Sequence, residues 1–327
     1  MKRTNTSGLI VFIIIVIIAV AGAVLSLFSP RSDYAPALPR AFGISFGSTA
    51  GRKTFFPQSD YIARLYITGT ITEATRTYNQ EWLLDTIAAL KDDPHNTGIM
   101  LNLDTPGGSV YQSDEAYLAL MDYKETTGRP VYAYITQMSA SGGYYISCAA
   151  DKIFGNRNGL TGSIGVIFGS SIDATELLKN IGIKTKTFHA GRNKTMLSFD
   201  EPLTEEQEAI MQAIADEAYE QFVGIVAESR NMTVDDVRTL ADGSIYTTTM
   251  AARHGLIDGV CTFDEALERM KADESLEDSD IEEFSYEYKE TFSSLFGNIL
   301  SRTLGTDALA KHLERAALSY PAYYFSW

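Results

Sequence analysis

Two apolar runs without a charged residue, Gly98 to Leu103 and Pro130 to Thr136, constrain the fold more than any other feature of the chain. Helical periodicity precedes each run, from Asn79 to Lys91 and from Tyr111 to Thr126, and Tyr61 to Ile71 predicts a further strand ahead of them. Strands that are apolar on both faces and alternate with helices are typical of a parallel or mixed sheet that helices cover. The sequence therefore predicts an α/β domain.

The later part of the chain continues this alternation. Strands are predicted at Lys152 to Phe154, through Ile167, at Ile183 to Phe188 and, after a turn, within Asp242 to Thr247. Helices are predicted at Asp173 to Asn180, from near Thr204 to near Asn231, at Val234 to Leu240 and at Met250 to His254. Thr204 and Gln207 have the spacing of a capping box, which marks the start of the long helix. Lys184 and Lys186 alternate with apolar residues, so we expect both on the solvent-facing side of their strand.

Charge and cysteine content exclude several kinds of site. The 327 residues carry a net charge of −15, whereas binding to nucleic acid requires clustered Lys and Arg that neutralise phosphate. Nine acidic residues and one lysine lie between Asp273 and Glu290, so more than half of the net charge is local. Cys148 and Cys261 form no Cys-x-x-Cys pair, so we expect neither a zinc site nor a disulfide framework, and Cys148 is expected to be a buried apolar residue. No metal or cofactor is predicted.

The N-terminal segment predicts a membrane anchor. Gly8 to Phe28 contains no charged residue and, as a helix, would be roughly 32 Å long, which matches a hydrocarbon core of about 30 Å. Lys2 and Arg3 precede it, so the positive-inside rule places residues 1–7 in the cytoplasm and the bulk of the chain on the outer side of a cell membrane. The small residues Ala21 to Ala23 leave a cleaved signal peptide open as the alternative.

Composition divides the rest of the chain into three parts. Residues 29–57 contain four prolines and no sustained periodicity, and are expected to be a linker. A single folded domain is expected at 58–272, followed by an acidic linker and C-terminal tail at 273–327.

A serine stands at the predicted strand-to-helix turn after the second apolar run. Met138 to Ala150 reads Met-Ser-Ala-Ser-Gly-Gly-Tyr-Tyr-Ile-Ser-Cys-Ala-Ala, and its small residues predict a helix packed closely on a neighbour. At such a turn the hydroxyl of Ser141 can project into a cleft, while the N–H groups of Gly142 and Gly143 point toward negative charge that develops there. The alternative is a tight turn without chemistry.

A second glycine turn directly follows the first apolar run. In Asp104 to Ser109, two adjacent glycines let the backbone approach a ligand closely and turn an N–H group toward it. The N–H groups of Gly108 and Gly142 would together form a two-donor oxyanion hole. Pro-Gly-Gly is also an ordinary turn sequence, which is the alternative here.

The base that would activate Ser141 is either a histidine or a lysine. Of the four histidines, only His189 lies near a candidate loop, and the chain has no Gly-x-Ser-x-Gly motif. Lys194 follows Gly191-Arg192-Asn193 in a loop just beyond a predicted strand, and a lysine activates a serine once its pKa falls from about 10.4 to about 7 or 8. Burial can supply the required energy of about 3 to 4 kcal/mol. Ser163 could then hold the neutral amine by a hydrogen bond, and a solvated Lys194 is the alternative.

Taken together, these segments resemble the signal peptide peptidase SppA type of membrane-anchored serine protease, in its short, single-repeat form. The segments that match in order and spacing are Asp104 to Ser109, Ser139 to Asp151, Thr161 to Val166, Gly191 to Lys194, the helix from Leu203 to Arg230, and Ala241 to Asp258. The resemblance implies a serine peptidase domain with a fold related to the Clp protease proteolytic subunit and crotonase, built from repeated β-β-α units.

The resemblance also implies a role for each candidate residue. Ser141 would be the nucleophile and Lys194 the general base, Gly108 and Gly142 would be the oxyanion-hole donors, and Ser163 would orient the lysine. The lysine would come from a neighbouring subunit of a ring-like homo-oligomer. The family usually has Lys-Tyr where this chain has Arg192-Asn193, and Ser or Asn where it has Thr105; these departures remove no catalytic group but bear on substrate preference.

The C-terminal tail is open to several interpretations. Phe292 to Leu304 predicts a short amphipathic helix, and Leu318 to Trp327 is rich in aromatic residues. We expect this aromatic end to pack on the oligomer. The alternatives are a position at the membrane interface and an inhibitory strand in the substrate groove of a neighbour.

The sequence thus predicts a membrane-anchored serine endopeptidase that degrades cleaved signal peptides or other extended apolar peptides outside the cytoplasm. One alternative is a membrane scaffold of the same fold that binds peptides without cutting them. Another is an acyl-CoA enzyme of the crotonase type, for which the sequence offers no coenzyme A site.

Overall fold

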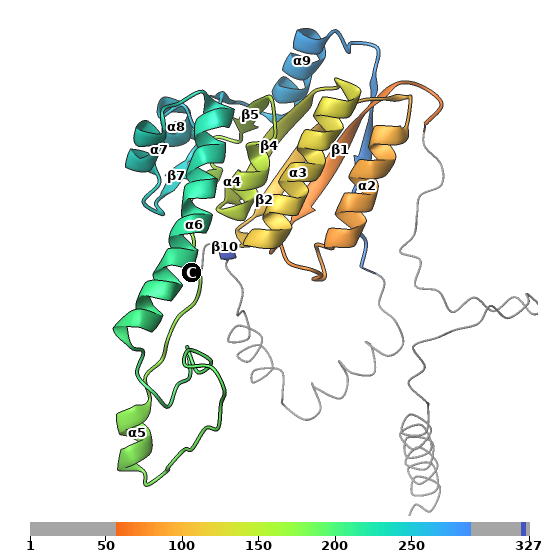
Figure 1. Cartoon of the computed structure of the whole chain (residues 1–327). Coiled ribbons are helices and arrows are strands. Elements are labelled where there is room, and N and C mark those ends of the chain that lie inside the picture. The colour runs from red at the N-terminus through yellow and green to blue at the C-terminus, as the bar shows by residue number, and fades with distance from the viewer. Residues whose placement is uncertain (1–56, 289–321, 325–327) are drawn as a thin grey trace, which may run out of the picture. The chain divides into compact units, whose positions relative to one another are not determined.

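The computed structural model describes residues 57–288 and 322–324 (Figure 1). The predicted membrane anchor at 8–28, nearly all of the predicted linker and the predicted helix at Phe292 to Leu304 lie outside the described residues. Among the residues that are described, no helix is both long enough and apolar enough to cross a bilayer.

One mixed sheet of eight strands forms the centre of the domain. Its strands are β1 (Tyr61–Thr68), β2 (Asn96–Thr105), β4 (Val131–Ala140), β5 (Lys152–Gly155), β6 (Leu160–Gly162), β7 (Ile245–Thr247), β8 (Gly259–Val260) and β9 (Asp280–Phe284). The main path runs β7-β6-β4-β2-β1-β9, while β5 pairs with the N-terminal half of β4 and β8 pairs with β5. Only β6 and β7 on this path are antiparallel, so the prediction of an α/β domain with a parallel or mixed sheet is confirmed.

Helices cover one face of the sheet and build the main core with it (Figure 1). They are α2 (Gln80–Asp92), α3 (Val110–Thr127), α4 (Gly142–Ser147) and the C-terminal half of α6 (Glu205–Arg230). Tyr61, Ala63 and Leu65 of β1 face this core because successive side chains of a strand point to opposite faces. From α6, Phe222 and Val226 are fully buried in the same core.

Within the described residues, the opposite face of the sheet is covered at one end only. There, α9 (Phe263–Glu274) packs Ala266 and Met270 against Ile62 and Met100. Further along the same strands this face carries polar side chains, including Arg64 and Asn102, whose side chains hydrogen-bond to each other. The face is therefore apolar under α9 and polar toward the carboxyl ends of the strands.

β4 contains a bulge shortly before its end. Ile135 pairs with Leu103 of β2 and Ser139 pairs with Thr105, so residues 136–138 lie opposite a single residue of β2. Residues 132–135, before the bulge, pair with β5, and residues 138–140 pair with β6. Bulges bend a strand and are common beside functional sites, and this one directs the last residues of β4 away from β5.

Between β6 and α6 the chain leaves the sheet and forms α5 (Thr175–Asn180), which lies beyond the N-terminal end of α6 (Figure 1). The predicted strand at Ile183 to Phe188 is wrong, because these residues have no regular structure and are all exposed. A strand needs a neighbouring strand for its backbone hydrogen bonds, and no described strand pairs with these residues. Lys184 and Lys186 are exposed, as expected, and Ile167 forms an isolated bridge instead of a strand.

The helices after this segment follow the sequence pattern closely. α6 begins at the predicted capping box, in which the Gln207 N–H donates to Thr204 Oγ1 at 3.3 Å and the Thr204 N–H donates to Gln207 Oε1 at 3.1 Å. α7 (Val234–Leu240) has the predicted bounds, and α8 (Thr248–Arg253) begins two residues earlier than predicted.

The acidic segment contributes a strand that its composition did not indicate. β9 lies parallel to β1 at the edge of the sheet, although three of its five residues are acidic. Glu283 accepts hydrogen bonds from Arg64 Nη1 at 3.1 Å and from the Tyr66 hydroxyl at 2.9 Å. The acidic linker predicted from residue 273 onward therefore includes an edge strand of the sheet.

Candidate active site

Ser141 lies at the turn between β4 and α4, where the sequence places it. Its backbone has φ 54° and ψ −117°, a conformation that costs a residue with a side chain on the order of 1–3 kcal/mol. The Ser141 N–H donates to the Gly162 carbonyl at 2.8 Å, and the Ser141 carbonyl accepts from the Tyr145 N–H at 2.9 Å. The surrounding structure therefore holds a strained turn at this serine, and strain of this kind clusters at functional sites.

The first turn of α4 approaches the end of β2 closely. Gly142 and Gly143 begin the helix, where N–H groups have no partner within the helix. A Cβ on Gly143 would lie 2.6 Å from Cγ2 of Thr105. Thr105 is fully buried, and its Oγ1 accepts the N–H of Gly107 at 3.0 Å. This threonine therefore fixes the turn that leads into β3 (Gly107–Ser109).

Gly108 lies in the middle of β3, against the backbone of Ile71. The Ile71 N–H donates to the Gly107 carbonyl at 2.9 Å, and the Ser109 N–H donates to the Ile71 carbonyl at 2.8 Å. A Cβ on Gly108 would lie 1.8 Å from the Ile71 carbonyl oxygen, so a side chain requires movement of the backbone. Because β3 contacts α4, Gly108 and Gly142 lie in adjacent elements beside Ser141.

Ser163 lies directly after β6, which pairs with the last residues of β4. It has φ 51°, is 8% exposed, and its N–H donates to the Ser244 carbonyl at 2.7 Å. The preceding residue, Gly162, accepts the N–H of Ser141. The structure therefore brings Ser163 close to the nucleophile candidate along the backbone.

Lys194 is not beside Ser141 in the same chain. It is exposed in a turn in which its N–H donates to the Gly191 carbonyl at 3.1 Å. This turn belongs to the segment between α5 and α6, which Figure 1 shows away from the sheet, whereas Ser141 is 1% exposed at the end of β4. One chain thus brings four of the five predicted site residues together and leaves Lys194 apart.

The described histidines do not provide a base at Ser141. His189 is exposed in the same segment as Lys194, with Nδ1 3.1 Å from the Gly191 carbonyl oxygen. His95 contacts Asp60, and His254 packs against the Tyr246 ring. The fourth histidine lies outside the described residues. A serine–histidine triad therefore gains no support from the described part of the chain.

Comparison with known proteins assigns the chain to a family. The model of peptidase family S49 matches residues 124–277. A protein of Enterococcus faecium that carries the name signal peptide peptidase SppA is 31% identical over 279 residues, which are 81% of this chain and 80% of that protein. The chain belongs to peptidase family S49. It is a serine peptidase of the SppA type, as its motifs predict.

Other proteins that resemble this S49 peptidase match a smaller part of its chain or are less identical in sequence. A protease of Synechocystis is 36% identical over 63% of this chain and 71% of its own length, and Protease 4 of Salmonella typhi is 31% identical over 63% of this chain and 33% of its own length. Among solved structures, a point mutant of ClpP1 from Listeria monocytogenes is 17% identical, covers 63% of this chain and 94% of its own, and has a TM-score of 0.42. A point mutant of the 1510-N membrane-bound stomatin-specific protease is 14% identical, covers 70% of this chain and 99% of its own, and has a TM-score of 0.46.

A strand from the C-terminal tail of the peptidase lies on β3. β10 (Ala322–Tyr324) pairs antiparallel with it, and Tyr323 is opposite Gly108. β10 also contacts α3 and α4. An extended peptide that adds to an exposed strand edge takes such a position. Three residues of the aromatic tail therefore lie beside the candidate oxyanion-hole glycine.

A hydrogen-bonded group that fixes α4 was not among the residues singled out in the sequence. The Tyr145 hydroxyl donates to Asp114 Oδ1 at 2.6 Å, and Nε2 of Gln221 from α6 lies 3.0 Å from Asp114 Oδ1 and 2.6 Å from the Tyr145 hydroxyl. The Tyr144 hydroxyl donates to the Leu256 carbonyl at 2.7 Å. The helix that follows Ser141 is thus tied to α3 and α6, and the Tyr-Tyr pair after Gly-Gly was the only signal for this.

The two cysteines of the peptidase play no visible part in the site. Cys148 lies at the end of α4 and belongs to the main core. Burial raises the pKa of its thiol to about 12, so the reactive thiolate is disfavoured. Cys148 is therefore the buried apolar residue that the sequence predicts.

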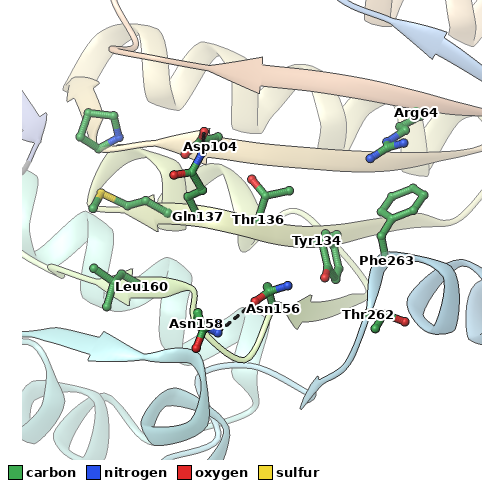
Figure 2. A pocket seen from close by; sticks show the side chains of 12 residues that line it. Arg64, Asp104, Tyr134, Thr136, Gln137, Asn156, Asn158, Leu160, Thr262 and Phe263 are labelled. Atoms are coloured by element: carbon green, nitrogen blue, oxygen red, sulfur yellow. Dashed lines mark hydrogen bonds between the residues drawn. The ribbon is translucent and has the colours of Figure 1, made fainter.

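A cavity of about 820 Å³ opens over the β4 bulge, on the face of the sheet opposite the helices of the main core (Figure 2). Asp104 lies in it, and its Oδ2 accepts a hydrogen bond from Gln137 Nε2 at 3.2 Å. Burial raises the pKa of Asp104 above its usual range, and a hydrogen bond from the Met138 N–H opposes this effect. The carboxylate thus joins the end of β2 to the bulge of β4.

Proposed function

We propose that this peptidase is an endopeptidase that cleaves extended, largely apolar peptides with a Ser141–Lys194 dyad. The observation that carries this proposal is the strained turn that holds Ser141 beside β3 and the first turn of α4. In the proposed reaction, Ser141 Oγ attacks the scissile carbonyl carbon while neutral Lys194 Nζ takes the hydroxyl proton. The N–H groups of Gly108 and Gly142 stabilise the oxyanion. The proton then passes to the leaving amine, and water hydrolyses the acyl-enzyme.

In this proposal Lys194 acts on Ser141 of a second copy within a homo-oligomer. Nine of the fifteen large apolar residues that are exposed in the described chain lie between residues 167 and 214, on both sides of Lys194: Ile167, Ile172, Leu177, Ile181, Ile183, Phe188, Leu197, Phe199 and Ile214. Concentrated exposed apolar surface marks an interaction site. Burial of Lys194 in such an interface would favour the neutral amine that a general base needs, and Ser163 would hold this amine in place.

The proposed substrates are cleaved signal peptides and similar apolar segments at a cell membrane. The name of the Enterococcus faecium relative supports this substrate class. The uncharged stretch at 8–28 would anchor the peptidase in the membrane, with residues 1–7 in the cytoplasm and the peptidase domain at 58–272 outside. The edge of β3, where β10 pairs, would receive the peptide in extended form.

The dyad can be tested with full-length protein in detergent and a fluorogenic apolar peptide. We expect Ser141→Ala and Lys194→Ala each to lower kcat by at least about a thousandfold, because each removes a group needed for acylation. Co-expression of the two variants should restore part of the activity, since some sites then combine an intact serine with an intact lysine. Lys184→Ala, an exposed lysine of the same segment, is the matched control and should retain activity.

The outcomes separate the proposals. Full activity of Lys194→Ala would rule out this base, and failure of the mixed sample to recover activity would argue against a dyad shared between copies. A wild-type protein that binds the peptide but never cleaves it would favour the peptide-binding scaffold.

A further inference from the structure

The cavity over the β4 bulge has the chemistry of a binding site that the proposed cleavage reaction does not use. Its floor is the uncovered face of the sheet, and Phe263 at the start of α9 closes one end (Figure 2). At about 820 Å³, it is within the size range of ligand-binding cavities. No residue proposed to act on the scissile bond lines it.

Two charged side chains, Arg64 and Asp104, line the cavity, and neither offers an unpaired positive charge to an acidic ligand. Arg64 donates through Nε and Nη2 to Asn102 Oδ1 at 3.1 and 2.8 Å, and through Nη1 to Glu283 at 3.1 Å. Its Cζ atom lies over the Phe263 ring, 3.7 Å from the ring centre. The other charged residue, Asp104, repels anions. Phosphates, nucleotides and acidic peptides are therefore poor ligands for this cavity.

The remaining lining combines side-chain amides with apolar walls. Gln137, Asn156 and Asn158 each offer both a donor and an acceptor, which is the pattern that a peptide group presents. Tyr134 and Phe263 form one wall, with their rings 5.4 Å apart edge to face. A neutral, extended polypeptide with an apolar side chain satisfies both kinds of surface.

The cavity continues toward the candidate active site along three strands. Pro106, Met138 and Leu160 lie in its lining and precede Gly108, Ser141 and Ser163 by two, three and three residues. At about 3.3 Å per residue, the end of the cavity is roughly 7 to 10 Å along the chain from these positions. A few residues of an extended peptide can bridge this distance.

We propose that this cavity is a second binding site for the polypeptide substrate, and that it holds a neutral, apolar segment a few residues away from the bond that Ser141 cleaves. The inference rests on the proposed function for the identity of the polypeptide. It explains why amide side chains lie where α9 leaves the sheet uncovered, next to the Phe263 ring at the start of that helix.

The test compares a long and a short substrate on full-length protein in detergent. The short one is a fluorogenic peptide that spans only the scissile bond, and the long one is reduced, unfolded casein. We expect Phe263→Ala and Asn158→Ala to lower the ratio of kcat/KM for casein to kcat/KM for the short peptide by about five- to tenfold, mainly through KM for casein. Asn158 is exposed, so its replacement leaves the fold intact even if Phe263→Ala does not.

The control is Leu118→Ala, which removes an exposed apolar side chain from α3, on the other face of the sheet, and should leave the ratio unchanged. An unchanged ratio in both cavity variants overturns the proposal. So does a change of oligomeric state in Phe263→Ala, measured by light scattering, because the cavity is then an interface between copies.

A binding measurement separates this proposal from the cleavage mechanism. Fluorescence anisotropy of labelled casein with the Ser141→Ala protein should show binding that Phe263→Ala and Asn158→Ala weaken about five- to tenfold. If the wild type cleaves neither substrate but this weakening is observed, the proposed function fails and the second site stands. If cleavage is confirmed and anisotropy is unaffected by either cavity variant, the second site is excluded.

Discussion

At the scale of single residues, the positive φ of Ser141 separates two substitutions that both remove its hydroxyl. Ser141→Ala keeps the Cβ and therefore the strain, whereas Ser141→Gly relieves it. We expect the glycine variant to be more stable by about 1 kcal/mol, or about 2 to 4 °C in Tm for a domain of this size. Calorimetry of the two inactive variants checks this, and an equal or lower Tm for Ser141→Gly would contradict a strained serine.

Gly108 should tolerate no side chain. The Cβ of Gly108→Ala would lie 1.8 Å from the Ile71 carbonyl oxygen, so β3 must shift and the N–H of residue 108 must leave the proposed oxyanion position. We expect kcat to fall by about 10²- to 10³-fold with a smaller change in KM. Gly224→Ala in α6, where nothing lies within 4 Å of the added Cβ, is the control and should keep full activity. Normal turnover by Gly108→Ala would remove Gly108 from the mechanism.

The carboxyl group of Asp104 should make the stability of the domain depend on pH. Burial raises its pKa in the folded state, so between its ordinary and its raised pKa the folded state binds more protons than the unfolded state. Stability from this group is therefore present at low pH and is lost as pH rises. We expect Asp104→Asn to raise Tm at pH 7 and to have little effect at pH 3. Thermal melts at the two pH values measure this, and the opposite order would show that the ionised form is the stabilised one.

The candidate site residues have local signals in the sequence, whereas their surroundings have none. Glycines next to Ser141 and directly after β2 are visible as local patterns, so Ser141, Gly142 and Gly108 could be selected without a structure. The bulge opposite Asp104 depends on pairing between β2 and β4, and the position of Lys194 depends on a segment that leaves the sheet. Neither has a local signal in the sequence.

At the scale of elements, β10 occupies the edge of β3 that a peptide substrate would need. Truncation after Tyr288 removes β10, and we expect turnover of a short peptide at subsaturating concentration to rise about two- to tenfold, because a competing strand no longer fills the site. Tyr323→Pro keeps the tail but removes one backbone donor, and should act in the same direction. Equal kcat/KM for the wild type and both variants would show that β10 does not compete with substrate.

Two segments show why strands are harder to predict from sequence than helices. Alternation of apolar and basic residues at Ile183 to Phe188 fits a strand, but a strand also needs a neighbour, and alternation does not report one. β9 shows the reverse case, since its acidic composition argued against a strand while Arg64 and Tyr66 of β1 offered partners for Glu283. The helices α6, α7 and α8, whose backbone bonds are internal, were predicted more closely, whereas α9 was not predicted.

At the scale of the whole molecule, the proposed dyad, shared between copies, would make activity depend on assembly. We expect the specific activity to fall when full-length protein is diluted below the concentration at which it associates, because Lys194 is then absent from Ser141 of the second copy. Phe188→Ser, which replaces a residue that is 83% exposed in this segment, should shift the fall to higher concentration. Specific activity and light scattering over the same dilution series test this. Activity that stays constant while the oligomer dissociates would place the base within one chain.

The position of β9 also has a consequence for how the chain folds. β1 pairs with β2 on one side and with β9 on the other, and about 220 residues separate β1 from β9 along the chain. At translation rates of about 5 to 20 residues per second, β1 keeps an unpaired edge for roughly 10 to 45 s after its own synthesis. Strand pairs that are so far apart in the sequence form late, and they lower the folding rate of the chain. The nascent chain should therefore depend on a chaperone to protect this edge from association with other chains.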